Sequence, residues 1–170
     1  MRLYSGKISV IAEDVVKVLV ADGDIEVENE AEVRLDIESV LKEHLRRDRE
    51  VTDEAKTRME QRGLGYSQLG KMKSQVAKEK NTPGQDDALP FLLEQILEIL
   101  FHSPNVIEVF AEDMDMRKKL APVLRKHMDV ETGLDEEVRS KIKNLEEGTA
   151  NFEVEYSKVM EQIKRKRGLT

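Results

Sequence analysis

Apolar residues recur at helical spacing along almost the whole chain. In the first segment, one face carries five of them: Ile8, Ile11, Val15, Val18 and Leu19. This spacing predicts an amphipathic helix, with Ser5 placed to cap its start. Asp22-Gly23-Asp24 ends the helix, because glycine flanked by acids is typical of a turn. Ile25 and Val27 then alternate with acidic residues in a connector.

Three further helices are expected before the first clear linker. The first runs from about Glu30 to Arg47, and its core face holds Val33, Ile37, Val40, Leu41, His44 and Leu45. Thr52 starts the next helix, because a capping residue followed by two acids suits a helix N-terminus. That helix ends at Gly63, and a weaker one covers residues 67–80.

Residues 81–87 form a linker, since their Pro-Gly pair stops one helix and the following acids prepare another. The linker separates an N-terminal helical half, residues 1–80, from a C-terminal half, residues 88–170. Leu89–Phe101 is apolar around most of the helical circumference, which places it at the centre of a core that both halves share.

Two more helical segments follow in the C-terminal half. One covers Asp113 to His127, and a long one runs from Asp135 to about Lys166. Gly148-Thr149 marks a break within the long segment, because glycine followed by a capping residue ends one helix and starts another.

The two halves resemble each other at an offset of 83 residues. Val33–Arg62 aligns without a gap to Met116–Leu145. Five positions are identical in this block: Arg34/Arg117, Val40/Val123, Leu41/Leu124, His44/His127 and Glu54/Glu137. The predicted fold is therefore all-α, a bundle of six to eight helices built from two similar halves by internal duplication. The alternative is chance similarity between amphipathic helices.

The amino-acid composition excludes several kinds of chemistry and indicates where the protein is located. The chain has 170 residues, no cysteine, 28 basic and 35 acidic residues, and a formal net charge of −7. Disulfides, thiolate catalysis and cysteine-type metal sites are excluded, and a reducing cytoplasm fits the absence of cysteine. Neither a secretory signal nor a membrane span is expected, because charges interrupt every apolar stretch. The predicted location is the cytoplasm, away from membranes.

Several short segments together resemble a known bacterial family, catalogued as domain of unknown function 507. They are Met1-Arg2-Leu3-Tyr4-Ser5-Gly6, the Val40-Leu41-Lys42 helix, His102-Ser103-Pro104-Asn105-Val106, Val109-Phe110-Ala111-Glu112-Asp113 and Pro122-Val123-Leu124-Arg125-Lys126-His127-Met128. The resemblance covers the whole chain. It implies a bacterial, cytoplasmic protein and supplies no activity or site residues.

Local motifs for catalysis and cofactors fail their spacing tests. Gly63–Gly70 matches neither phosphate-loop pattern nor the serine elbow, and a turn between helices explains it. His44 and His127 occupy equivalent repeat positions, so they are candidates for a pair of structural histidines or for a metal or pH-sensing pair. The sequence predicts no cofactor and no catalytic residue.

A strictly alternating acidic run is the first candidate binding feature. It consists of Asp22, Asp24, Glu26, Glu28, Glu30 and Glu32. A calcium loop is excluded, because Val27 stands where the loop needs glycine and Val33 where it needs glutamate. The run is interpreted as a solvated connector, with Ile25 and Val27 turned inward, that also offers an acidic docking surface.

Two basic stretches oppose this run and are the candidate contacts for nucleic acid or another anion. The first comprises Arg62, Lys71, Lys73, Lys78 and Lys80, and the second is Lys164, Arg165, Lys166 and Arg167. Such patches focus a positive field even in an acidic protein. Bases near a helix end also suit the helix dipole, which is the plainer explanation of the second stretch.

Three function classes follow in order of preference. The first is a non-enzymatic interaction or scaffold protein that binds an unidentified protein partner through its charge-segregated surfaces. The second is a nucleic-acid-associated protein that uses the basic stretches weakly. The third is an enzyme whose site residues converge without a local motif. Both a monomer and a homodimer remain open.

Overall fold

The computed structural model describes residues 1–129 and 131–170. The described chain is mostly helical, as predicted, and contains seven α-helices and one two-stranded sheet. The α-helices are α1 (Ile8–Ala21), α2 (Glu30–Arg62), α3 (Leu69–Glu79), α4 (Ala88–His102), α5 (Asp113–Met128), α6 (Glu131–Lys141) and α7 (Ala150–Lys166). The strands are β1 (Ile25–Val27) and β2 (Val106–Val109), and 3-10 turns cover Ser5–Lys7 and Tyr66–Gln68.

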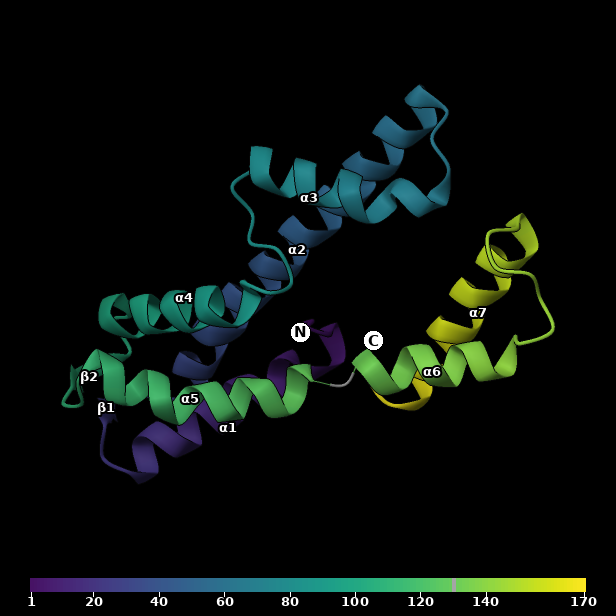
Figure 1. The fold of residues 1–170 in the computed structure, drawn as a ribbon. Helices are drawn as coiled ribbons and strands as arrows, with labels where there is room; N and C mark the ends of the chain where they lie inside the picture. The colour runs from purple at the N-terminus through teal and green to yellow at the C-terminus, as the bar shows by residue number, and fades with distance from the viewer. Residues whose placement is uncertain (130) are drawn as a thin grey trace.

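A central body forms from α1, α4, α5 and the first part of α2 (Figure 1). Its core is aliphatic and includes residues from both halves of the chain, among them Ile11, Leu19, Ile37, Leu41, Leu92, Ile96, Leu100, Leu120 and Leu124. α4 contributes seven buried residues to it: Ala88, Leu89, Leu92, Leu93, Ile96, Leu97 and Leu100. The expectation that this helix is buried nearly all round is too strong, because Phe101 is exposed.

Two helical hairpins extend from this body (Figure 1). The first hairpin consists of the C-terminal part of α2 packed on α3, with a small core of Val51, Ala55, Met59, Met72, Val76 and Ala77. The second hairpin pairs α6 with α7 around Leu134, Val138, Ile142, Phe152 and Ile163, together with Tyr4 and Leu169 from near the two ends of the chain.

The predicted separation of α2 into two helices is wrong. One helix runs unbroken from Glu30 to Arg62, since residues 47–52 contain neither glycine nor proline. Thr52 does not cap a new helix. Its hydroxyl donates to the Asp48 carbonyl at 2.9 Å, within the helix. The predicted end is confirmed, because Gly63 adopts a left-handed φ of 62° as the C-terminal cap.

Other boundaries differ in smaller ways. Ser5 lies in the 3-10 turn, and α1 starts at Ile8 without a side-chain cap. The break predicted near Gly148 is present, with α6 ending at Lys141 and Thr149 accepting from the Phe152 N–H at 3.2 Å as the cap of α7. The strict all-α expectation missed the sheet. β1 and β2 form because Ile25 is buried against the body and pairs with Val109.

The two halves share one order of elements: helix, strand, helix, then a hairpin. Val40 and Val123, which the 83-residue offset pairs, are both half-buried against the central core. A shared order does not establish an internal duplication, which stays a prediction. None of the helices within the described ranges is long and apolar enough to cross a bilayer.

Candidate protein-docking surface

The β1–β2 ribbon lies at the end of the body away from both hairpins (Figure 1). Its antiparallel register pairs Ile25 with Val109, Glu26 with Glu108, and Val27 with Val106. Ile107 is therefore an extra residue on β2, which makes this position a β-bulge. A bulge redirects side chains, and here it exposes two consecutive residues of β2, Ile107 and Glu108.

Large apolar side chains are exposed around this bulge. Ile107 is 60% exposed, Phe110 58% and Met114 66%. All three lie within the eight residues from 107 to 114, which run from β2 into the first turn of α5. The Phe110 N–H donates to the Asp24 carbonyl at 2.8 Å, which fixes this residue beside β1. Neighbouring exposed apolar residues rimmed by charges are typical of interaction sites.

Two glutamates face each other across the ribbon. Glu26 and Glu108 are both exposed, and they are direct partners in the register. Like charges in that position destabilise a strand pair. In the described part of the chain, no ion pair neutralises either side chain. The fold itself therefore gains no stability from this pair.

Most of the other acids in the predicted run either form an ion pair within the chain or lie at a helix N-terminus. Lys119 on α5 binds Asp24 at 2.6 Å and Asp22 at 3.0 Å. These two hydrogen bonds, Asp24 first, raise the pKa of Lys119 above its usual value. Glu30 and Glu32 lie in the first turn of α2, where negative charge stabilises the helix N-terminus. Of the predicted run, the residues without such a role are Glu26 and Glu28.

We define the ribbon surface as the exposed side chains at this end of the body. It consists of Glu26, Glu28, Ile107, Glu108, Phe110, Glu112 and Met114. Glu28 belongs to it because its N–H donates to the Asn105 carbonyl at 2.9 Å, just before β2. A second contact holds the turn before β2 in place, since Asp36 of α2 accepts from Ser103 and from Asn105.

Sequence reasoning found only the β1 side of this surface. The five residues contributed by β2, the first turn of α5 and the connection between them were missed: Ile107, Glu108, Phe110, Glu112 and Met114. A usable signal was present, because residues 105–116 resemble residues 25–33 in mixing acids with apolar residues and in containing no lysine or arginine.

The first basic stretch lies on the first hairpin. Lys80 pairs with Glu54 at 2.8 Å. Lys71 and Lys78 are exposed and Lys73 is half-buried on α3, while Arg62 is exposed at the end of α2. Within the described ranges these four have no ion-pair partner, so a positive surface of four residues remains there.

The second basic stretch is mostly occupied by contacts within the chain. Arg165 pairs with Glu161 at 2.5 Å, Arg167 pairs with Glu137, and the Lys164 ammonium lies 5.7 Å from the centre of the Tyr4 ring. Lys166 is exposed. The two basic stretches lie on different hairpins, so they do not form one continuous footprint.

The two histidines have separate surroundings. His44 packs from α2 against Phe91 of α4, with 5.9 Å between the ring centres. His127 Nε2 on α5 is 2.9 Å from an Asp14 carboxylate oxygen on α1. Each histidine thus contacts a different helix of the body.

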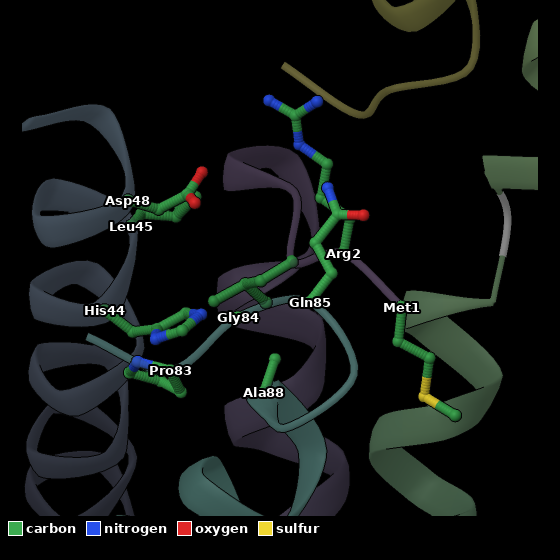
Figure 2. Close-up of a pocket in the computed structure, with 10 residues that line it drawn as sticks. Met1, Arg2, His44, Leu45, Asp48, Pro83, Gly84, Gln85 and Ala88 are labelled. Carbon is green, nitrogen blue, oxygen red and sulfur yellow. The ribbon is translucent and has the colours of Figure 1, made fainter. Parts of the chain in front are cut away.

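His44 lines a small cavity together with the chain's N-terminal residues and the linker before α4 (Figure 2). It is 7% exposed, and its Nδ1 has no hydrogen-bond partner in the part of the chain that the structure describes. Burial lowers its pKa. The cavity is ≈ 20 Å³, which holds about one water molecule. Figure 2 shows the Arg2 guanidinium pointing away from the ring.

A larger cleft of ≈ 390 Å³ lies beside it, between the first hairpin and the 82–87 linker. Its charged lining residues are Asp48, Lys73, Asp86 and Asp87. None of the three histidines lines it, so Ser74 has no imidazole base there. Among the described residues, no group of three or more His, Asp or Glu side chains is arranged to hold a metal ion.

These features define a class: a small helical protein with two hairpins, whose most distinctive exposed feature is an acidic and apolar ribbon. Comparison with protein-family models matches residues 1–169 to the family described as Protein of unknown function (DUF507). The chain belongs to this family, as its sequence resemblance predicted. A search of curated proteins found no match. The family description names no activity.

Proposed function

We propose that the protein is a non-enzymatic interaction module that binds a protein partner at the ribbon surface. The observation that carries this proposal is the β-bulge, which turns Ile107 and Glu108 to solvent together. Folding alone would favour an inward Ile107 and an oppositely charged partner for Glu108. A sequence that departs from both preferences at one place supports a binding role.

The nucleic-acid alternative has less support. Phosphate binding needs a concentrated basic footprint, and Arg165, Arg167 and Lys80 have carboxylate partners within the chain. The four uncommitted bases of the first hairpin keep this alternative open as a weaker activity. An enzymatic role remains the third alternative, and the charged cleft lined by Asp48, Lys73, Asp86 and Asp87 is the place where it would be sought.

Site-specific photo-cross-linking tests the proposal. Ile107 is replaced by the photoreactive residue p-benzoylphenylalanine, and the protein is irradiated in its native cells. A discrete cross-linked protein is expected, because this position would lie inside the interface. The matched control is the same replacement at Val154 of α7, which is 65% exposed and lies on the second hairpin. Equal products at both positions, or none at Ile107, would contradict the proposal.

The proposal has three finer parts. The protein acts in the bacterial cytoplasm, which its lack of cysteine supports. Its two halves arose by duplication, which the shared order of elements supports. It acts as a monomer or homodimer, and sedimentation equilibrium distinguishes these two states.

A further inference from the structure

We infer that the docking segment of the partner is rich in lysine or arginine and carries apolar anchors. This inference rests on the proposed function, since it names the chemistry of the occupant of the ribbon surface. It follows from the charge and the apolar exposure of that surface, taken in turn.

The two chain segments that form the ribbon and its flanks carry charge of one sign. Residues 25–33 and 105–116 together contain eight acids and no lysine or arginine. The acids are Glu26, Glu28, Glu30, Glu32, Glu108, Glu112, Asp113 and Asp115. A surface of one sign attracts partners of the opposite sign and speeds their association.

Four of these acids are already accounted for within the chain. Asp113 pairs with Arg117 at 3.0 Å, and Asp115 lies 3.9 Å from Lys118. Glu30 and Glu32 stabilise the start of α2. The uncommitted acids are Glu26, Glu28, Glu108 and Glu112, all exposed and all part of the ribbon surface.

The Glu26–Glu108 pair makes the choice of partner specific. A lysine or arginine placed between these carboxylates would be attracted to both and would offset their mutual repulsion, so the bound state gains more than it would at an isolated glutamate. Arginine is well suited, because its planar guanidinium donates to two carboxylates at once.

The exposed apolar residues of the ribbon surface indicate which apolar side chains the partner's docking segment must carry. Ile107, Phe110 and Met114 sit next to the acids, so the partner must bury apolar side chains against them while its bases reach the glutamates. Apolar contacts at the centre with charges at the rim are the usual anatomy of an interface. An unstructured polycation without apolar side chains would contact only the glutamates at the rim of the ribbon surface.

Peptide binding with charge-matched probes tests this inference. The probe is a short fluorescein-labelled peptide that alternates lysine with leucine, and the control peptide alternates glutamate with leucine. Fluorescence anisotropy of the full chain is measured at about 50 mM and about 500 mM salt, because screening weakens exposed charge pairs. The lysine peptide is expected to bind, more tightly at the lower salt, and the glutamate peptide is not.

Variants locate the interaction. The double substitution Glu26→Gln and Glu108→Gln should weaken binding of the lysine peptide by about tenfold and reduce its salt dependence. The matched control, Glu60→Gln with Glu94→Gln, removes the same charge from exposed positions on α2 and α4 and should leave binding unchanged. Phe110→Ser should weaken binding at both salt concentrations. Circular dichroism confirms that each variant is folded.

The outcomes separate the inference from the proposed function. Equal binding of both peptides, or unchanged binding by the Glu26/Glu108 variant, would overturn the basic-partner inference. A cross-link at position 107 would then still support the docking surface. Self-association abolished by the same substitutions would also overturn the inference, because the occupant would be a second copy of this chain. So would calcium binding at Glu26 and Glu108 without peptide binding. Absence of both peptide binding and the cross-link would overturn both proposals.

Discussion

The two hairpins are built alike but are attached to the body in different ways. α2 passes without interruption from the central core into the first hairpin. In the second half, α5 ends at Met128 and α6 begins at Glu131, so no single helix joins body and hairpin. The second hairpin is instead closed by the ends of the chain, with Tyr4 and Leu169 in its core.

The two small cores also differ in composition. The first hairpin, rigidly continued from the body, packs small and flexible residues such as Ala55 and Met72, and ion pairs of Arg58 with Glu54 and Glu79 flank it. The second hairpin carries larger apolar and aromatic groups, including Phe152 and Tyr156. The larger side chains of the second hairpin can stabilise it more per residue, because hydrophobic stabilisation scales with the apolar area removed from water.

The largest expected effect comes from Leu134→Ala in the second hairpin. Leu134 is fully buried, and truncating such a leucine costs about 2–5 kcal/mol. Because no continuous helix supports this hairpin, hydrogen exchange should lose protection throughout α6 and α7 while α2 and α3 keep theirs. The counterpart Val76→Ala, in the first hairpin, should leave α6 and α7 protected. Uniform loss of protection in either variant would show that the hairpins do not respond separately.

A glycine near the N-terminus makes the closure of the second hairpin sensitive to one methyl group. A Cβ at Gly6 would lie 2.3 Å from the Gly168 carbonyl oxygen, and the Gly6 N–H donates to the Leu169 carbonyl at 3.1 Å. Gly6→Ala should therefore lower the free energy of unfolding by about 1–3 kcal/mol, measured by urea denaturation. Gly65→Ala is the control, since nothing lies within 4 Å of its Cβ position. Similar losses in both variants would contradict the closure.

The buried His44 on α2 should make the stability of the protein depend on pH. Burial lowers the pKa of His44 below its ordinary 6.5, so the unfolded chain binds its proton more readily than the folded one. The contribution of His44 to the free energy of unfolding is fully present above pH 6.5. It is lost as the pH falls toward the lowered pKa of this residue. Thermal unfolding between pH 8 and pH 5 should show this loss. His44→Phe should reduce the pH dependence, and His102→Gln, at an exposed position, should preserve it. An unchanged profile in His44→Phe would refute this assignment.

The smallest expected effect concerns the ion pairs of the first hairpin. Arg58 joins α2 to α3 through Glu79 at 2.7 Å, and hydrogen bonds to Glu79 and Glu54 raise its pKa. Arg58→Gln should lower the melting temperature slightly, and the difference from wild type should shrink in high salt because these side chains are partly exposed. A salt-independent difference would indicate lost packing of the arginine stem.

Helical periodicity predicted most of the secondary structure because it is a local property. It identified α1, α4 and the end of α2 at Gly63 from neighbouring residues alone. It failed at Thr52, where a capping signal lies inside a helix that has no glycine or proline nearby and that packs Val51 and Ala55 in the core of the first hairpin. Local preference is routinely overridden by such tertiary contacts.

The ribbon surface was less accessible to sequence reasoning for a related reason. Glu26 and Glu108 are 82 positions apart, and only the strand register brings them face to face. The acidic run could be identified from the sequence. The sequence did not show which of its acids are neutralised within the fold and which are not. Lys119, far along the chain, neutralises Asp22 and Asp24 and leaves Glu26 and Glu28 uncommitted. Which charges are available for binding is therefore a property of the folded pairing.

The contact between Gly6 and Leu169 has a consequence for biosynthesis. Tyr4 emerges from the ribosome about 165 residues before Leu169, its neighbour in the core of the second hairpin. The body and first hairpin can assemble while translation continues, since domains generally fold as their segments emerge. Tyr4 remains without its final neighbours until α7 has been released. The second hairpin is thus expected to become resistant to protease later than the body and the first hairpin.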